Sequence, residues 1–171
     1  MRYLTIVRHG ESTPAQPREA DYDRGLSERG ERQCEELREW ASDSDALGRF
    51  GPVTALVSSA KRTKETFKRA FAKTDFVLDK HYSEMIYNGR RDVTPEDLLI
   101  ELAAIDPVTT SLLVVAHNPT VLELMILLAK ELPHSLRRFH YPLGAAYVLA
   151  LPDDRPVGLA RYEVMASYLP S

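Results

Sequence analysis

Short runs of apolar residues, many of them β-branched, alternate along the chain with segments whose apolar residues recur every three or four positions. Continuous apolar runs are typical of strands buried on both faces of a sheet, and the wider spacing is typical of helices that bury one face. The pattern therefore predicts strands over residues 3–7, 53–57, 76–78, 112–116, 145–151 and 159–164, the last from strict alternation of apolar and polar positions.

The helical segments between these strands carry start signals. Ser27 is an expected N-cap for a helix that ends near Ala41. The run Thr94-Pro95-Glu96-Asp97 combines a threonine cap, a proline at the first helical position and acids at the positive end of the helix dipole. Asn118-Pro119 begins a further helix, and another follows Ser59. We therefore expect a helix after most of the buried strands.

The order of elements indicates the fold class. Strand and helix alternate, and the chain finishes with two strands that have no helix between them. This order predicts an α/β fold, a three-layer sandwich with a mostly parallel sheet, an antiparallel edge and helices on both faces. The polar, proline-containing stretch 11–25 is expected to be a loop. No repeat or linker divides the chain, so we expect a single domain over residues 1–171.

Composition and net charge argue against several classes of protein. Apolar residues make up 44% of the chain and charged residues 27%, which is ordinary for a globular protein. The formal net charge of −3 gives no sign of a nucleic-acid partner. The one cysteine, Cys34, cannot form an intrachain disulfide and is expected in the core. Since the sequence shows neither a signal-peptide pattern nor a membrane span, we expect a cytoplasmic monomer.

The residues that leave the buried strands are the candidates for chemistry. The strand at 3–7 leads into Arg8-His9-Gly10, the strand at 53–57 into Ser58 and then Arg62, and the strand at 112–116 into His117-Asn118. In open α/β sheets, ligands bind beyond the carboxyl ends of the strands. If these strands are parallel neighbours, their histidines and arginines face a shared pocket.

A phosphoryl group explains this combination of residue types. The guanidinium groups of Arg8 and Arg62, with a helix N-terminus, suit a dianion. His9 is a possible covalent nucleophile, Gly10 allows close approach of the backbone, and His117 can stabilise charge in the transition state. Each charge-assisted contact is worth roughly 1.5–3 kcal/mol.

A metal site built from His9, His117 and Glu84 is the rival interpretation. Metal ions favour a neutral or anionic surround, whereas Arg8 and Arg62 would lie beside the ion. We therefore expect neither a metal nor another cofactor.

Four motifs resemble those of a known family: Arg8-His9-Gly10-Glu11, Leu26-Ser27-Glu28-Arg29-Gly30, Ser58-x-x-x-Arg62-x-x-x-Thr66 and Val115-Ala116-His117-Asn118. In order and spacing they are similar to the histidine phosphatase superfamily, also called phosphoglycerate mutase-like. The short chain and the turn Arg24-Gly25-Leu26-Ser27 resemble its SixA-type phosphohistidine phosphatases. Ser59 and Thr63 depart from the usual proline and alanine.

The resemblance implies a role for each matching residue. His9 is the residue that becomes phosphorylated, and Arg8, Arg62 and His117 complete the phosphate pocket. The general acid in this family often follows the third strand, where this chain has Glu84. The alternative is that Glu84 simply starts a surface turn, and the sequence leaves this open. The expected substrate-binding residues are Gly10, Arg24, Ser58 and Asn118.

The resulting expectation is a phosphatase that works through a phosphohistidine intermediate on His9. A phosphohistidine carried by a protein is the favoured substrate, and a sugar or nucleotide phosphate is the alternative. A non-catalytic phosphate-binding module is a further alternative. The basic run of Arg137, Arg138 and His140 either lines the pocket mouth or is a solvated loop, and the sequence leaves this open, as it does for Arg90-Arg91.

Overall fold

The computed structural model describes residues 1–43 and 51–171, and its strands form one six-stranded sheet in the order β3-β2-β4-β1-β5-β6. The strands are β1 (Arg2–Arg8), β2 (Val53–Ser58), β3 (Val77–Ser83), β4 (Ser111–Ala116), β5 (Ala146–Leu151) and β6 (Val164–Tyr168). Strands β3, β2, β4 and β1 are parallel, and β5 and β6 are each antiparallel to their neighbours. The predicted mostly parallel sheet with an antiparallel edge is confirmed.

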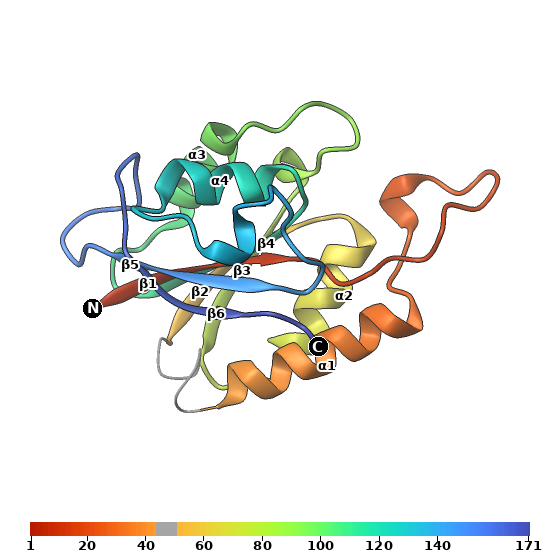
Figure 1. The fold of residues 1–171 in the computed structure, drawn as a ribbon, viewed down its shortest axis with the longest axis horizontal. Helices are drawn as coiled ribbons and strands as arrows, with labels where there is room; N and C mark the ends of the chain where they lie inside the picture. Colours follow the sequence, from red (N-terminus) through yellow and green to blue (C-terminus); the bar gives the residue numbers. More distant parts are fainter. Residues whose placement is uncertain (44–50) are drawn as a thin grey trace.

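Helices cover both faces of this sheet (Figure 1). Helices α1 (Glu28–Ser42) and α2 (Lys61–Ala70) pack together on one face, and α3 (Pro95–Ile105) and α4 (Thr120–Leu128) on the other. Short 3-10 helices occur at η1 (Asp21–Asp23), η3 (Glu84–Ile86) and η4 (His134–Leu136). The predicted caps are confirmed: the Ser27 hydroxyl accepts from the amide of Gly30 at 3.0 Å, and Thr94 forms a capping box with Asp97.

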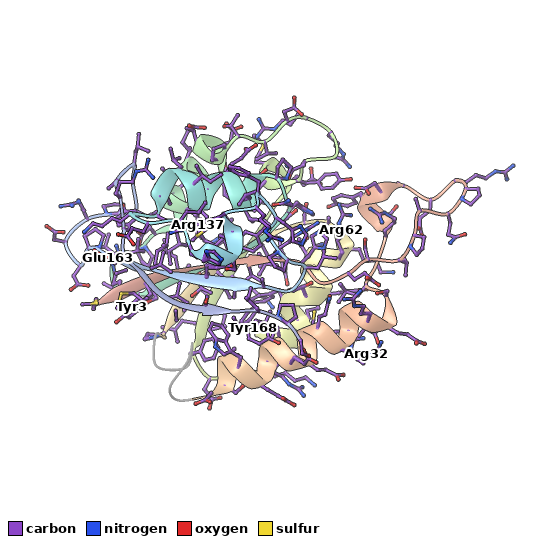
Figure 2. All side chains as sticks on the ribbon, viewed as in Figure 1. Tyr3, Arg32, Arg62, Arg137, Glu163 and Tyr168 are labelled. Carbon is purple, nitrogen blue, oxygen red and sulfur yellow. The ribbon has the colours of Figure 1, made fainter. Side chains whose placement is uncertain are left out.

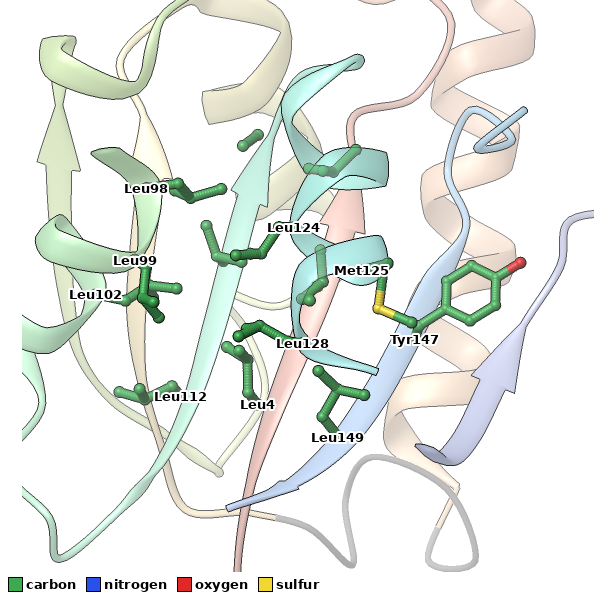
Figure 3. Close-up of a cluster of buried hydrophobic side chains, with 14 of the residues drawn as sticks. Leu4, Leu98, Leu99, Leu102, Leu112, Leu124, Met125, Leu128, Tyr147 and Leu149 are labelled. Carbon is green, nitrogen blue, oxygen red and sulfur yellow. The ribbon is translucent and has the colours of Figure 1, made fainter. Parts of the chain in front are cut away.

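Alternation along the strands divides the core into two apolar layers. In β1, Leu4 and Ile6 point toward α3 and α4, whereas Val7 points toward α1 and α2. Figure 3 shows the leucine-rich layer, in which Leu98 of α3 and Leu124 of α4 face the strands. Full burial of each such side chain stabilises the fold by about 1.5–3 kcal/mol. The sheet is therefore held rigidly from both sides.

The last strand lies further along the chain than the predicted segment 159–164. Tyr162 pairs instead with the end of α4, because its amide donates to Leu128 O at 2.7 Å and its carbonyl accepts from Lys130 N at 2.8 Å. Its ring is buried, and its hydroxyl donates to Gly158 O. The alternating residues of this segment therefore form a loop that is hydrogen-bonded to the end of α4. The residue-by-residue pairing with β5 begins only at Val164.

The register of β1, β4 and β2 brings their carboxyl ends side by side. Val115 is opposite both Val7 and Val57, and His9 N donates to Ala116 O at 3.2 Å. Segment 11–25 leaves this end as a loop and extends away from the sheet (Figure 1). No helix among residues 1–43 and 51–171 is long and apolar enough to cross a membrane.

Candidate active site

The two predicted histidines meet at this end of the sheet. The ring centroids of His9 and His117 are 5.2 Å apart, with the rings inclined at 58°. Both side chains are mostly buried, yet both line one cavity of about 450 Å³. Residues more than one hundred positions apart in the sequence therefore share a single pocket.

The cavity combines predicted and unpredicted residues. Arg62 lies at the end of the sheet from which segment 11–25 extends (Figure 2). The lining residues are Arg8, His9, Glu11, Ser12, Asp21, Arg24, Arg62, Asn88, Gly89, His117, Asn118 and Leu143. Gly10 and Ser58, also predicted, lie behind this lining and contact the two histidines.

His9 is held in one tautomer. Its Nδ1 lies 2.7 Å from Gly10 O, and because a carbonyl oxygen only accepts, Nδ1 carries the proton. Burial lowers the pKa of His9 to about 3; the bond to Gly10 opposes the shift, and the charge of Arg62 adds to it. The ring is therefore neutral at neutral pH, with its lone pair on Nε2.

Gly10 permits this arrangement because the chain passes very close to α1. A Cβ at residue 10 would lie 2.9 Å from Gly30 O and 3.2 Å from Cys34 Sγ. The Gly10 amide donates to Thr66 Oγ1 at 3.0 Å, which ties the segment to α2 as well. Cys34 is buried as predicted, and burial raises the pKa of its thiol to about 11.

His117 is oriented by Ser58. Its Nε2 lies 2.7 Å from Ser58 Oγ, and its Nδ1 is buried with no hydrogen-bond partner in the described part of the chain. Burial lowers the pKa of His117 well below its usual value, and the charges of His9 and Arg62 act in the same direction. His117 therefore lines the cavity as a neutral ring whose Nδ1 has no hydrogen-bond partner among the described residues.

Three guanidinium groups make the cavity positive. Arg8 Nη1 donates to Tyr141 O at 2.6 Å, and its buried Nε has no partner among residues 1–43 and 51–171. Arg24 Nη1 donates to Ser12 Oγ at 2.9 Å. Arg62 donates through Nη2 to the carboxylate of Asp21 at 3.0 Å. This arrangement offers several N–H donors to an anion.

Asp21 is a site residue that the sequence did not reveal. Its carboxylate accepts hydrogen bonds from Arg24, Arg62 and the hydroxyl of Tyr87, the last at 2.6 Å. Partial burial alone would raise the pKa of Asp21, but these hydrogen bonds and the arginine charges lower it far below its usual value. Asp21 is therefore ionised. It begins the short 3-10 helix η1 within the polar segment 11–25, where no periodicity distinguishes one acid from the next.

The structure does not bring Glu84 into the cavity. Strand β3 ends at Ser83, and the chain turns into η3, so the Glu84 carboxylate points to solvent, with two thirds of its side chain exposed. Its nearest cation is Arg90, at 3.7 Å. Tyr87, after the turn, contacts the site through its hydrogen bond to Asp21, and the next two residues, Asn88 and Gly89, line the cavity.

The other basic candidates also lie outside the cavity lining. Arg137 lines a separate surface groove with Glu131 and His134, and Figure 2 shows it apart from Arg62. Arg138 and His140 are exposed. Within the described ranges, no group of three or more His, Cys, Asp or Glu side chains is placed to hold a metal ion.

Comparison with known proteins identifies the family to which this chain is similar. The family model of the histidine phosphatase superfamily (branch 1) matches residues 4–104. No curated protein sequence matches the chain significantly.

Solved structures match over nearly the whole chain. A candidate phosphohistidine phosphatase SixA from Agrobacterium tumefaciens has 25% sequence identity and a TM-score of 0.76, covering 99% of each chain. Another candidate SixA, from Nakamurella multipartitia, has 24% identity and a TM-score of 0.77, covering 99% of this chain and 96% of its own. The protein histidine phosphatase SixA in complex with tungstate has 17% identity and a TM-score of 0.72, covering 96% and 95%.

Proposed function

The chain belongs to the histidine phosphatase superfamily and is a phosphatase, and from this membership we propose that it removes the phosphoryl group of a protein phosphohistidine through a covalent intermediate on His9. The observation that carries this proposal is the meeting of His9, His117 and the guanidinium groups of Arg8 and Arg62 around one cavity. The proposal needs no metal or other cofactor.

His9 is the proposed nucleophile. The proton on Nδ1 is fixed by Gly10 O, so the lone pair of Nε2 is free to attack phosphorus without prior proton transfer. In the first step the Nε2–P bond forms and the bond from phosphorus to the leaving group breaks, with its electron pair staying on the leaving group. In the second step water attacks phosphorus, an O–P bond forms and the Nε2–P bond breaks with its electron pair returning to Nε2, so inorganic phosphate is released and His9 is regenerated.

The phosphoryl oxygens are bound by donors on three sides. Arg8 and Arg62 supply N–H groups, and we assign the amide of Asn118, just before α4, to the same anion. When Ser58 donates to Nε2 of His117, the proton of that ring resides on Nδ1. The otherwise unpartnered Nδ1–H then donates to a phosphoryl oxygen.

The acids near the cavity indicate which leaving group, and therefore which class of substrate, the site suits. Of the carboxylates at the cavity, Asp21 is ionised by its partners, and Glu11 accepts from Ser27 and Arg29. Glu84, the acid implied by resemblance, points to solvent. An oxygen leaving group needs a proton from such an acid, whereas an imidazole already protonated on its far nitrogen leaves as a neutral ring. The site therefore suits a phosphorus–nitrogen bond.

A small phosphomonoester remains the second candidate. A cavity of about 450 Å³ lies within the range that holds small ligands, and the segments carrying Asp21 and Asn88 flank it. The non-catalytic alternative is disfavoured by the unprotonated Nε2 of His9.

The test compares His9→Ala with His81→Ala, a matched control that removes a partly exposed histidine of β3 outside the cavity lining. Each protein is given a phosphohistidine peptide and a generic aryl phosphate, and samples are quenched in acid or base. The parent and the control should hydrolyse the peptide and carry phosphate that is labile in acid and stable in base. His9→Ala should lose at least a thousandfold in kcat and carry no such phosphate; an active His9→Ala would sink the proposal.

A further inference from the structure

The amide of Asn88 is fixed in orientation at the cavity wall. The hydroxyl of Thr120 donates its single proton to Val93 O at 3.0 Å. It must therefore accept from Asn88 at the 2.7 Å contact between the two side chains, so the atom in that contact is the amide nitrogen Nδ2. The carbonyl oxygen Oδ1 is the part of Asn88 left for another partner.

Oδ1 of Asn88 has no such partner in the part of the chain that the structure describes. The atom is buried and accepts no hydrogen bond from any of the described residues. Buried polar atoms are nearly always hydrogen-bonded, and leaving one unsatisfied is costly. Asn88 lines the cavity with Gly89, so a ligand in this cavity is the natural source of a donor.

The Asn88 oxygen is a hydrogen-bond acceptor, and this distinguishes it from the donor groups of the phosphate pocket. Arg8, Arg62 and Arg24 present donors, which suit phosphoryl oxygens. A carbonyl oxygen repels a phosphoryl oxygen and requires an N–H or O–H instead. Asn88 is hydrogen-bonded to Thr120, the first residue of α4, which follows His117-Asn118 closely in the sequence. It therefore lies near the phosphate site without matching the anion.

We propose that Asn88 Oδ1 accepts a hydrogen bond from the protonated ring nitrogen of the phosphohistidine substrate, and so selects an N–H-bearing leaving group. This proposal rests on the proposed function and deepens it. As His9 attacks, the P–N bond breaks and its electron pair stays on the ring nitrogen that held phosphorus. The proton on the far nitrogen stays in place, held by Asn88, so the ring leaves as neutral imidazole and no acid of the chain is consumed.

The experiment uses two small probes that differ in one donor. N-phosphoimidazole can carry a proton on its far nitrogen, whereas its N-methylated derivative has a methyl group there. The measured quantity is the ratio of kcat/KM for the two probes, after subtraction of spontaneous hydrolysis. The parent should prefer the N–H probe by at least tenfold, and in Asn88→Ala the ratio should fall to within about twofold of one, in keeping with a hydrogen bond to a charged donor.

Two further variants keep the result interpretable. Asp92→Ala changes an exposed residue of the same segment and should keep the parental ratio. Thr120→Val removes the hydroxyl that fixes the Asn88 amide, and it should lower the ratio with the Asn88 side chain still present. A parent without preference, or an Asn88→Ala protein with the parental ratio, overturns the assignment.

A third arm separates this proposal from its premise. If the parent hydrolyses a sugar phosphate but neither phosphoimidazole, both the phosphohistidine function and the role of Asn88 are overturned. If the phosphoimidazoles are hydrolysed without discrimination while Asn88→Ala impairs only sugar phosphate hydrolysis, the partner of Oδ1 is a sugar hydroxyl. In that case phosphohistidine hydrolysis stands and the imidazole assignment fails.

Discussion

The hydroxyl of Ser58, at the end of β2, lies 2.7 Å from Nε2 of His117, which follows β4. Adjacent strands thus place a neutral donor against one ring nitrogen and leave the other, Nδ1, without a partner among the described residues. The tautomer of His117 is thereby coupled to a residue that does not line the cavity itself.

Ser58→Ala should lower kcat by about tenfold with a smaller change in KM, because the lost hydrogen bond, about 1.4 kcal/mol, orients His117, which we propose acts on the transition state. Ser58→Thr retains a hydroxyl and should restore part of the rate. Ser59→Ala is the matched control, since the Ser59 hydroxyl is buried without a partner in the described ranges. Equal rates for the parent and Ser58→Ala would contradict the orienting role.

Lowering the pH should destabilise the protein between about pH 6.5 and pH 3. The pKa of His9 is about 3 in the folded chain, against about 6.5 when unfolded. Between these values the unfolded chain binds a proton that the folded chain does not, so stability falls as pH falls and is constant above the window.

His9→Gln should reduce this dependence by one proton, about 1.4 kcal/mol per pH unit. Urea unfolding at several pH values measures the slope. His117, whose pKa is also lowered, leaves a residual slope in the variant. Identical slopes for the parent and His9→Gln would contradict the lowered pKa of His9 in the folded chain.

Asp21→Asn should strengthen inhibition by inorganic phosphate three- to tenfold. The carboxylate of Asp21 neutralises part of the charge of Arg62 and Arg24, and its removal leaves a more positive cavity. Asp23→Asn changes a neighbouring acid of η1 that does not line the cavity, and its inhibition constant should match that of the parent. Weaker inhibition of Asp21→Asn would mean that Asp21 mainly holds Arg62 in position.

Gly10→Ala should destabilise the fold by roughly 1–3 kcal/mol, the usual cost of an added methyl group in a closely packed site. The new Cβ would lie 2.9 Å from Gly30 O, so the segment after β1 must shift, and with it the carbonyl that holds His9. Activity should fall at least tenfold. Gly158→Ala is the control, because a Cβ there would meet no atom of the described residues within 4 Å. Urea midpoints and kcat/KM test both effects.

The sequence was sufficient for the parts of the site that follow regular elements. His9, Ser58 and His117 each come directly after or at the end of a buried strand, and parallel pairing of β1, β4 and β2 brings such positions together. Arg62 was placed with them by the start of α2. Hydrophobic periodicity and helix caps were thus enough to predict most of the fold and the residues at the centre of the pocket.

The rest depends on irregular backbone. Asp21 and Asn88 lie in segments without periodicity, and only the contacts Tyr87–Asp21 and Asn88–Thr120 show where they point. Glu84 was expected at the site because it follows the third strand, but the 3-10 turn after Ser83 redirects it to solvent. A single turn of this kind leaves no reliable trace in the pattern of apolar and polar residues.

The central position of β1 in the sheet has a consequence for biosynthesis. Residues 2–8 are synthesised well before their partners, because they pair with 111–116 on one side and 146–151 on the other, and Gly144 N donates to His9 O at 3.0 Å. A nascent chain that ends before residue 111 has the proposed nucleophile, His9, but neither of the strands next to β1 nor His117. Hydrolytic capacity therefore emerges only after residues 111–151 have been synthesised, and the long sequence separation of these pairings favours slow folding.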